Sequence, residues 1–553
     1  MTRGQVRSLV GATIVLAVLT AGLPAAHAEV ADPTPLITQV SDINPQGRSN
    51  PAEFVVADDV LYFGAGDAQD DRQLWAHDAA ANGGQGSTYR VTDLVDPGFG
   101  GPSVRQLTLL DGRIFFVADT PATGDELYVY DPATDETQLA ADVVPGPEGS
   151  FAEQLTVAGD DLYFKTDDLL LETQQLWEFD PSSGGAGGLR KILDVGVDSG
   201  FSVGVGMGDT LYLVGAIEGL TEGQELLAYD TTSDALVAVT NFTGRYSFVV
   251  NVLGSEYGRV YLQAYTTARG YEPYDFDPAT GRTRLVADLK PGSAASSPSY
   301  VEGLDGMVYF PAAGPQGGVE LWRFDPVTRA VQLAADISAS AGGDPASSSF
   351  PSGLTAVDGK LYLGASRNPR QGAYRDAELW VFDPSAAGVA SMVQELFTGT
   401  AAKDGSNPTG MTAYDGAVFF TARGDVDGYE LYRYDQRPHE LAAVLYAGAE
   451  VSAPGTVKVT VYLRNNTGSA VSGRLLLQVG RPDGTLVTRT VGTEQQIPPG
   501  GTRTVTVNVP IGADDAPGRY EALLTLVTAD RRTLAADDFV FDVVVRKLSL
   551  LTP

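Results

Sequence analysis

The chain has 553 residues, too many for one ordinary hydrophobic core, so its length predicts two or three folding units. Apolar residues make up 43% and charged residues 19%, a balance that excludes a disordered chain, and 64 glycines and 32 prolines predict many turns. The absence of cysteine excludes disulfides, thiolate metal sites and cysteine nucleophiles. Only His77 and His439 lie outside the predicted leader, which argues against a histidine zinc site or a His-centred triad.

Residues 1–28 have the pattern of a secretory signal peptide. Two arginines precede an apolar run at 9–23, and the tripeptide at 26–28, Ala-His-Ala, matches an A-x-A cleavage site. The run is shorter than the roughly 20 residues that a membrane helix needs, so a retained anchor is the less favoured alternative. We therefore expect a secreted, extracellular protein with no membrane span after cleavage of the leader.

The net charge of −33 is concentrated in one part of the chain. Residues 440–553 carry equal numbers of acidic and basic side chains, and the leader carries two arginines, so residues 29–439 have a net charge of −35. A surface of this kind repels nucleic acid and anionic polysaccharides. We expect no nucleic-acid partner.

A short motif recurs eight times between residues 73 and 435. Its copies begin with Glu or Gln, usually continue with Leu and an aromatic residue, and have an aspartate three residues further on. The eight aspartates are Asp78, Asp131, Asp180, Asp230, Asp277, Asp325, Asp383 and Asp435. Their spacing of 47 to 58 residues is typical of β-propeller blades.

Each copy predicts a blade of four short strands. The Asp-Gly pairs at 111–112 and 305–306 are typical of two-residue hairpins between a first and a second strand. The motif itself forms the third strand, and Asp-Pro after it favours a type I turn. Residues 36–42, before the first copy, have the pattern of a fourth strand. We expect this strand to complete blade eight and close a propeller over 29–439.

The repeat resembles that of secreted bacterial proteins with ELWxxDGT repeats, also described as hyalin-like. The resemblance is carried by Gln73-Leu74-Trp75-Ala76-His77-Asp78 and by the copy at 287–325, and it covers about 36–435. It departs from the family pattern where Pro-Ala-Thr or a similar sequence replaces Gly-Thr after the aspartate. The resemblance implies a propeller and no catalytic residue.

From residue 440 the composition shifts to valine and threonine. Alternating patterns at 457–463 and 504–509, with further runs up to 545, predict about seven strands, the number of an Ig-like β-sandwich. This part is similar to accessory β-sandwich domains of secreted bacterial enzymes and adhesins. The predicted fold is therefore all-β, an eight-bladed β-propeller followed by an Ig-like β-sandwich over 440–553.

The recurring residues of the motif favour structural roles. A catalytic constellation occurs once, whereas a residue present in every blade serves the blade. We expect the aspartates to cap turns and the glutamates to make local hydrogen bonds. The Trp and Tyr side chains of the motif, including Trp322 and Trp380, are expected to pack between blades rather than to stack on sugars.

Two acidic turns contain candidate calcium ligands. Asp425 and Asp427 have the i, i+2 spacing of calcium loops, and Asp67, Asp70 and Asp71 occupy the equivalent turn of blade one. Neither turn has the complete ligand set of a calcium loop, so a solvated loop is the favoured alternative. No cofactor other than calcium enters the prediction.

The absence of a unique catalytic cluster in the repeat favours a secreted, non-catalytic binding or scaffold protein. Its partner would be an extracellular protein or a neutral glycan. The alternative is a secreted propeller enzyme, either a quinoprotein-like dehydrogenase or a polysaccharide-active hydrolase or lyase. The lack of cysteine and the scarcity of histidine weigh against the quinoprotein.

Overall fold

The computed structural model divides into two compact units, one of residues 36–79 and 86–435 and the other of residues 1–35, 80–85 and 436–553. The structure describes residues 37–435 except 46, 68–71, 82–85, 96–101, 169–171, 184–187, 197–198, 243–245, 316–317, 341–346, 367–376, 386–389, 395, 397–404 and 425–427. Of the remaining chain it describes the strands given below.

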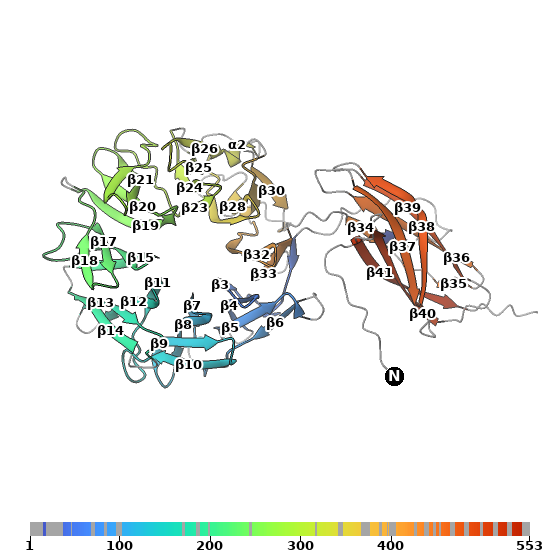
Figure 1. Ribbon diagram of the computed structural model, residues 1–553, viewed down its shortest axis with the longest axis horizontal. Helices are drawn as coiled ribbons and strands as arrows, with labels where there is room; N and C mark the ends of the chain where they lie inside the picture. The colour runs from blue at the N-terminus through green and yellow to red at the C-terminus, as the bar shows by residue number, and fades with distance from the viewer. Residues whose placement is uncertain are drawn as a thin grey trace, which may run out of the picture. The chain divides into compact units, whose positions relative to one another are not determined.

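The first unit is an eight-bladed β-propeller, as predicted (Figure 1). Blades 1 to 4 contain β3 (Ala52–Ala57), β4 (Val60–Gly66), β5 (Arg72–Asp78) and β6 (Ser87–Arg90); β7 (Arg105–Leu110), β8 (Arg113–Thr120), β9 (Gly124–Asp131) and β10 (Glu136–Ala141); β11 (Glu153–Ala158), β12 (Asp161–Asp168), β13 (Thr173–Phe179) and β14 (Leu189–Val195); and β15 (Gly200–Met207), β16 (Thr210–Ala216), β17 (Glu225–Asp230) and β18 (Ala235–Ala238). Blades 5 to 8 contain β19 (Phe248–Glu256), β20 (Arg259–Thr266), β21 (Gly270–Asp277) and β22 (Arg282–Leu285); β23 (Glu302–Leu304), β24 (Met307–Ala313), β25 (Val319–Phe324) and β26 (Val331–Ala335); β27 (Ser352–Val357), β28 (Lys360–Ser366), β29 (Ala377–Phe382) and β30 (Ala390–Gln394); and β31 (Thr409–Tyr414), β32 (Ala417–Arg423), β33 (Tyr429–Asp435) and β2 (Ile37–Gln39). A short helix, α2 (Ile337–Ser340), follows β26.

The N-terminal strand closes the ring, which confirms that prediction. β2 pairs antiparallel with β33, with Ile37 opposite Tyr434. Ile37 is buried among hydrophobic side chains of blades 7 and 8, and the amide of Val40 donates to the carbonyl of Leu431 at 2.8 Å. Blade 8 is therefore built from both ends of the propeller sequence.

The predicted turn chemistry is confirmed between the first and second strands and after the third strand. Asp111 and Gly112 have φ values of 51° and 73°, the left-handed geometry that a type I′ hairpin requires. The carboxylate of Asp325 accepts hydrogen bonds from the amides of Val327 and Thr328, at 2.8 and 3.1 Å. The aspartates of other blades make the same contact at their turns, as Asp131, Asp180, Asp230, Asp277 and Asp383 show.

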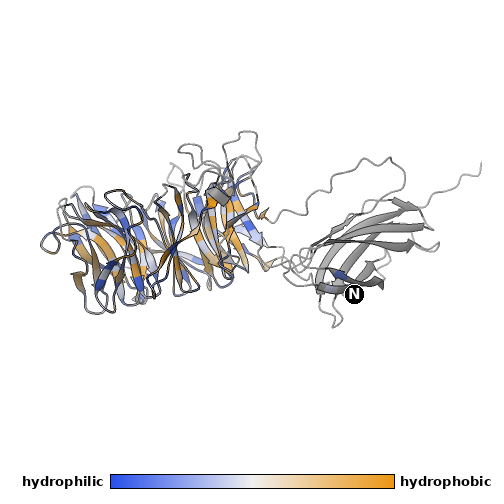
Figure 2. Cartoon of the chain, turned by 90° about the horizontal axis from the view of Figure 1, so that it is seen from above, coloured by the Kyte–Doolittle hydropathy of each residue, from blue (hydrophilic) through white to orange (hydrophobic). Residues whose placement is uncertain are grey.

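The hydrophobic core lies between neighbouring blades, and Figure 2 shows apolar residues spread through the strands of the propeller. Trp380 is 4% exposed, packs in a cluster that spans blades 6 and 7, and donates from Nε1 to the carbonyl of Ala365 at 2.9 Å. Trp322 is half-buried against the cluster between blades 5 and 6. Both side chains therefore belong to the inter-blade core, as predicted.

The second unit consists of two β-sheets. Their orders are β1-β34-β36-β39 and β35-β41-β40-β37-β38. The strands are β1 (Val15–Ala17), β34 (Ala442–Leu445), β35 (Glu450–Ser452), β36 (Gly455–Arg464), β37 (Val471–Gly480), β38 (Leu486–Ile497), β39 (Thr502–Ile511), β40 (Gly518–Val527) and β41 (Thr533–Val544). No helix among the described residues is long and apolar enough to span a membrane.

Candidate functional site

The glutamates of the motif bind the linkers that lead from one blade to the next. Glu126 accepts hydrogen bonds from the amides of Val143 and Val144, at 3.0 and 2.9 Å, and from the hydroxyl of Ser150 at 2.8 Å. The same glutamate-to-serine contact recurs in Glu272–Ser296, Glu320–Ser349, Glu378–Ser406 and Glu430–Ser49. The expectation of a local hydrogen bond was therefore wrong. The bond joins the third strand to a segment about 24 to 29 residues away within the chain, or across the ring closure.

Burial raises the pKa of these glutamates. The pKa of Glu126 rises to about 7, and burial also raises the pKa of Glu225, Glu272, Glu320 and Glu430. A raised carboxyl pKa is a common mark of a catalytic acid, but here it recurs from blade to blade. The raised pKa is therefore a property of the repeated blade structure and does not identify an active site.

In blade 4 a threonine takes the place of this serine. Glu225, which is 7% exposed, accepts from the hydroxyl of Thr240 at 2.5 Å and from the amide of Phe242 at 2.8 Å. Blade 1 has the same arrangement, because Gln73 accepts from the hydroxyl of Thr92 at 2.7 Å and from the amide of Leu94 at 3.0 Å. Further along the linker from blade 4, Tyr246 has a φ of 70°. Positive φ recurs at the same place, two residues before the first strand of the blade, at Asn50, Ser103, Phe151, Phe350 and Asn407.

A cleft of about 1000 Å³ lies beside this linker, and we call it the blade-4 cleft. Its walls are the loop between β16 and β17 and the linker between β18 and β19. It is lined by Ala216, Leu220, Thr221, Glu222, Gly223, Gln224, Glu225, Ala238, Thr240, Asn241, Phe242, Tyr246, Ser247 and Phe248. Tyr246 is 66% exposed, and Glu222 is also exposed.

The side chains of the cleft combine aromatic, amide, hydroxyl and carboxylate groups. Phe242 packs edge-on against Tyr274 of β21, with ring centroids 5.1 Å apart, which holds one aromatic wall in place. Its described lining residues include two glutamates and no lysine or arginine. Glu225 is committed to holding the linker, whereas the carboxylate of Glu222 lies at the exposed loop. The cleft therefore suits a neutral or cationic ligand.

Sequence reasoning missed this cleft. A Ser-x-Pro sequence occurs at 49–51, 296–298, 349–351 and 406–408, and the serine of each binds a motif glutamate. The linker at 239–247 lacks that sequence, and Thr240 makes the contact with Glu225. The linkers at 91–104, 142–152 and 196–199 lack it too, so its absence does not single out the cleft.

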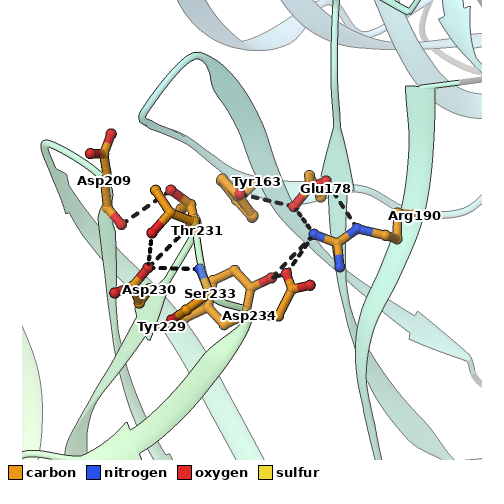
Figure 3. A network of polar contacts seen from close by, with 10 residues as sticks. Tyr163, Glu178, Arg190, Asp209, Tyr229, Asp230, Thr231, Ser233 and Asp234 are labelled. Carbon is orange, nitrogen blue, oxygen red and sulfur yellow. Dashed lines mark hydrogen bonds and ion pairs between the residues drawn. The ribbon is translucent and has the colours of Figure 1, made fainter.

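A second polar cluster joins blades 3 and 4 (Figure 3). Glu178 accepts from the hydroxyl of Tyr163 at 2.9 Å and from two nitrogens of Arg190 at 3.0 and 2.6 Å. Arg190 also contacts Asp234 of blade 4 at 2.8 Å, and the hydroxyl of Tyr229 donates to Asp234 at 2.6 Å. Arg190 pairs with Glu178 within blade 3 and with Asp234 across the blade boundary. The network therefore fits an inter-blade contact rather than a site for a ligand.

The five candidate calcium ligands are divided between described and undescribed residues. Asp67 contacts Arg90 at 3.4 Å, and its backbone carbonyl accepts from the side chain of Asn44 at 3.1 Å. Asp70, Asp71, Asp425 and Asp427 lie outside the described residues. Among the described residues, no group of three or more His, Asp or Glu side chains is placed to hold a metal ion.

Comparisons with known proteins give fold-level similarity only. No model of a protein family matches the chain, and no curated protein is similar to it in sequence. Similar solved structures include a prolyl endopeptidase, with 10% identity, a TM-score of 0.46 and coverage of 76% of this chain and 55% of that one. A puromycin hydrolase has 13% identity, a TM-score of 0.41 and coverage of 77% and 60%. Prolyl oligopeptidase B from Galerina marginata has 12% identity, a TM-score of 0.41 and coverage of 76% and 57%.

These solved structures contradict the expectation of a non-catalytic binding or scaffold protein, because they are enzymes. This chain spans 55% to 60% of the length of the three proteins above. With identities and TM-scores this low, none of their substrates or catalytic residues is transferred to this chain.

Proposed function

We propose that this protein is a hydrolase that acts on an extracellular polymer, and that the blade-4 cleft binds its substrate. The observation that carries the proposal is a cleft of about 1000 Å³ with Glu222 as an exposed carboxylate on its wall. The blades share many structural features, but a substrate site needs one unique set of side chains. Glu222 and the aromatic residues of the cleft lie outside the repeated motif, so the cleft provides such a set.

The two glutamates of the cleft take different roles in this proposal. A carboxylate that reaches the substrate can activate the attacking water or protonate the leaving group. Glu222 is the candidate for this role because it lies on an exposed loop of the cleft. Glu225 makes the structural contact that glutamates make in other blades, so it is a positioning residue that fixes the linker through Thr240 and Phe242.

The test is a turnover assay of the full chain on neutral polysaccharides, anionic polysaccharides and peptides, with detection of newly released chain ends. Glu222→Gln should lower kcat by roughly a hundredfold, the contribution typical of a positioned acid or base. Glu218→Gln is the matched control, because Glu218 is exposed in the same loop but does not line the cleft. It should leave turnover unchanged.

Hydrolysis that survives Glu222→Gln at the wild-type rate would place the active site elsewhere. The absence of hydrolysis across the whole panel would reject the enzyme proposal. Secretion supports an extracellular substrate but remains a prediction from the leader at 1–28. The Ig-like sandwich over 440–553 also remains a prediction, supported by the two sheets of that unit.

A further inference from the structure

We propose that the polymer is a neutral polysaccharide, whose sugar rings pack on aromatic side chains in and beside the blade-4 cleft. This inference rests on the proposed function, since it assumes that the cleft is the substrate site. Three observations carry it: an exposed tyrosine in the cleft, a row of aromatic rings that continues from the cleft, and the composition of the cleft walls.

Tyr246 is an exposed aromatic residue of the cleft. Its side chain is 66% exposed and its φ is 70°. Positive φ at this place recurs before the first strand of other blades, as at Phe151 and Phe350, so the backbone conformation belongs to the repeat. The exposed aromatic ring, which lines a cleft, is suited to contact a ligand.

A row of three aromatic rings extends from the cleft across blade 5, and we call it the blade-5 row. Phe248 on β19 lies opposite Tyr265 on β20, which lies opposite Tyr271 on β21. The ring centroids of Phe248 and Tyr265 are 5.4 Å apart, and those of Tyr265 and Tyr271 are 4.8 Å apart. All three rings are half-buried, and Phe248 also lines the cleft. The row therefore continues the aromatic surface of the cleft.

The blade-5 row is not a feature of the repeat. In the equivalent pairs described for other blades at most one residue is aromatic, as in Asp119–Asp125, Ala313–Val319, Ser366–Ala377 and Arg423–Tyr429. A core role would recur with the blade, as the motif tryptophans do. The row instead occurs next to the blade-4 cleft, which associates both with the same ligand.

The polar groups of the cleft favour a sugar over a peptide. Gln224, Asn241 and Thr221 offer amide and hydroxyl groups for hydrogen bonds with sugar hydroxyls, and the aromatic rings offer apolar faces. An extended peptide is held mainly by backbone hydrogen bonds to an open strand edge. The walls of this cleft are a loop and a linker, and β17 is paired on both sides. Glu222 and Glu225 disfavour an anionic chain.

The test measures binding separately from turnover, in the full chain carrying Glu222→Gln. Soluble neutral polysaccharides, an anionic polysaccharide and a lysine-rich peptide are titrated by calorimetry. Neutral polysaccharide should bind, and Tyr246→Ala and Tyr271→Ala should each raise its Kd roughly tenfold or more, as for loss of an aromatic anchor. The control Tyr257→Ala removes a 47% exposed tyrosine from the turn between β19 and β20 and should leave the Kd unchanged.

The variants are first compared by thermal melting. Tyr246→Asn provides a second test at that position, because asparagine tolerates the left-handed conformation, and it should also weaken binding. Binding of the peptide or the anionic chain without binding of neutral polysaccharide would overturn the inference, as would unchanged affinity in folded Tyr246 and Tyr271 variants. Binding without any hydrolysis would support this inference while rejecting the hydrolase. Peptide hydrolysis without polysaccharide binding would support the hydrolase and overturn this inference.

Discussion

At the scale of single residues, one buried carboxyl group can join two blades. Glu126 is fully buried and receives three hydrogen bonds from the linker that follows its blade. Burial raises its pKa from 4.5 to about 7 despite these bonds. The desolvation of the charged form therefore exceeds the stabilisation that its donors provide.

This shift predicts how the free energy of unfolding depends on pH. Because the pKa of Glu126 is higher in the folded chain, its contribution to stability is complete below about pH 4.5 and is lost as pH rises to about 7. Over that window Glu126 should lower the stability by about 2 kcal/mol, after allowance for solvent screening. Urea unfolding of wild type and Glu126→Gln across this range measures the difference.

The difference between wild type and Glu126→Gln cancels the contributions of other titrating groups. One of these is His77, because burial lowers its pKa to about 4. Glu136→Gln is the control, because Glu136 is exposed on the same blade. The same loss of stability between pH 4.5 and 7 in wild type and Glu126→Gln would contradict the assignment to Glu126.

At the scale of strands and turns, local chemistry made most of the fold predictable. Asp111 and Gly112 identified a hairpin, and Asp325 identified a turn, because each acts through backbone groups within a few residues. The contacts of Glu126 with Ser150, and of Glu225 with Thr240, were not predictable in this way. They depend on where a linker passes the start of the third strand, which is fixed only when the blade is assembled.

The candidate site was less predictable than the fold for the same reason. The blade-5 row combines Phe248, Tyr265 and Tyr271, which are 17 and 6 residues apart in the sequence and become neighbours through strand register. A shift of register by one residue would turn a side chain to the other face of the sheet. No repeated sequence pattern marked this region, since Ser-x-Pro is absent from the linkers at 91–104, 142–152 and 196–199 as well as from 239–247.

The closing strand β2 provides a prediction at this scale. Deletion of residues 29–42 removes Ile37 from the core of blade 8 and exposes the edge of β33. The melting temperature should fall by at least about 5 °C. Deletion of residues 29–35, which leaves β2 in place, is the control and should leave the melting temperature unchanged. An equal melting temperature for both deletions would show that β2 does not stabilise the ring.

At the scale of the whole molecule, the charge of the propeller limits the ligands that it can bind. With a net charge of −35 over 29–439, the acidic propeller disfavours anionic ligands over its whole surface. The blade-4 cleft adds aromatic and amide groups to that background at one place. The repeated blades thus provide a support for a site whose side chains lie outside the repeated motif.

The most direct test of the central claim is hydrogen–deuterium exchange of the Glu222→Gln chain with and without neutral polysaccharide. The substrate should slow amide exchange in the loop between β16 and β17 and in the linker between β18 and β19, with little change in the hairpin turns at 111–112 and 305–306. Protection in those two cleft segments is the result that we predict. Protection confined to other blades, with exchange in both cleft segments unchanged, would contradict the assignment of the substrate site.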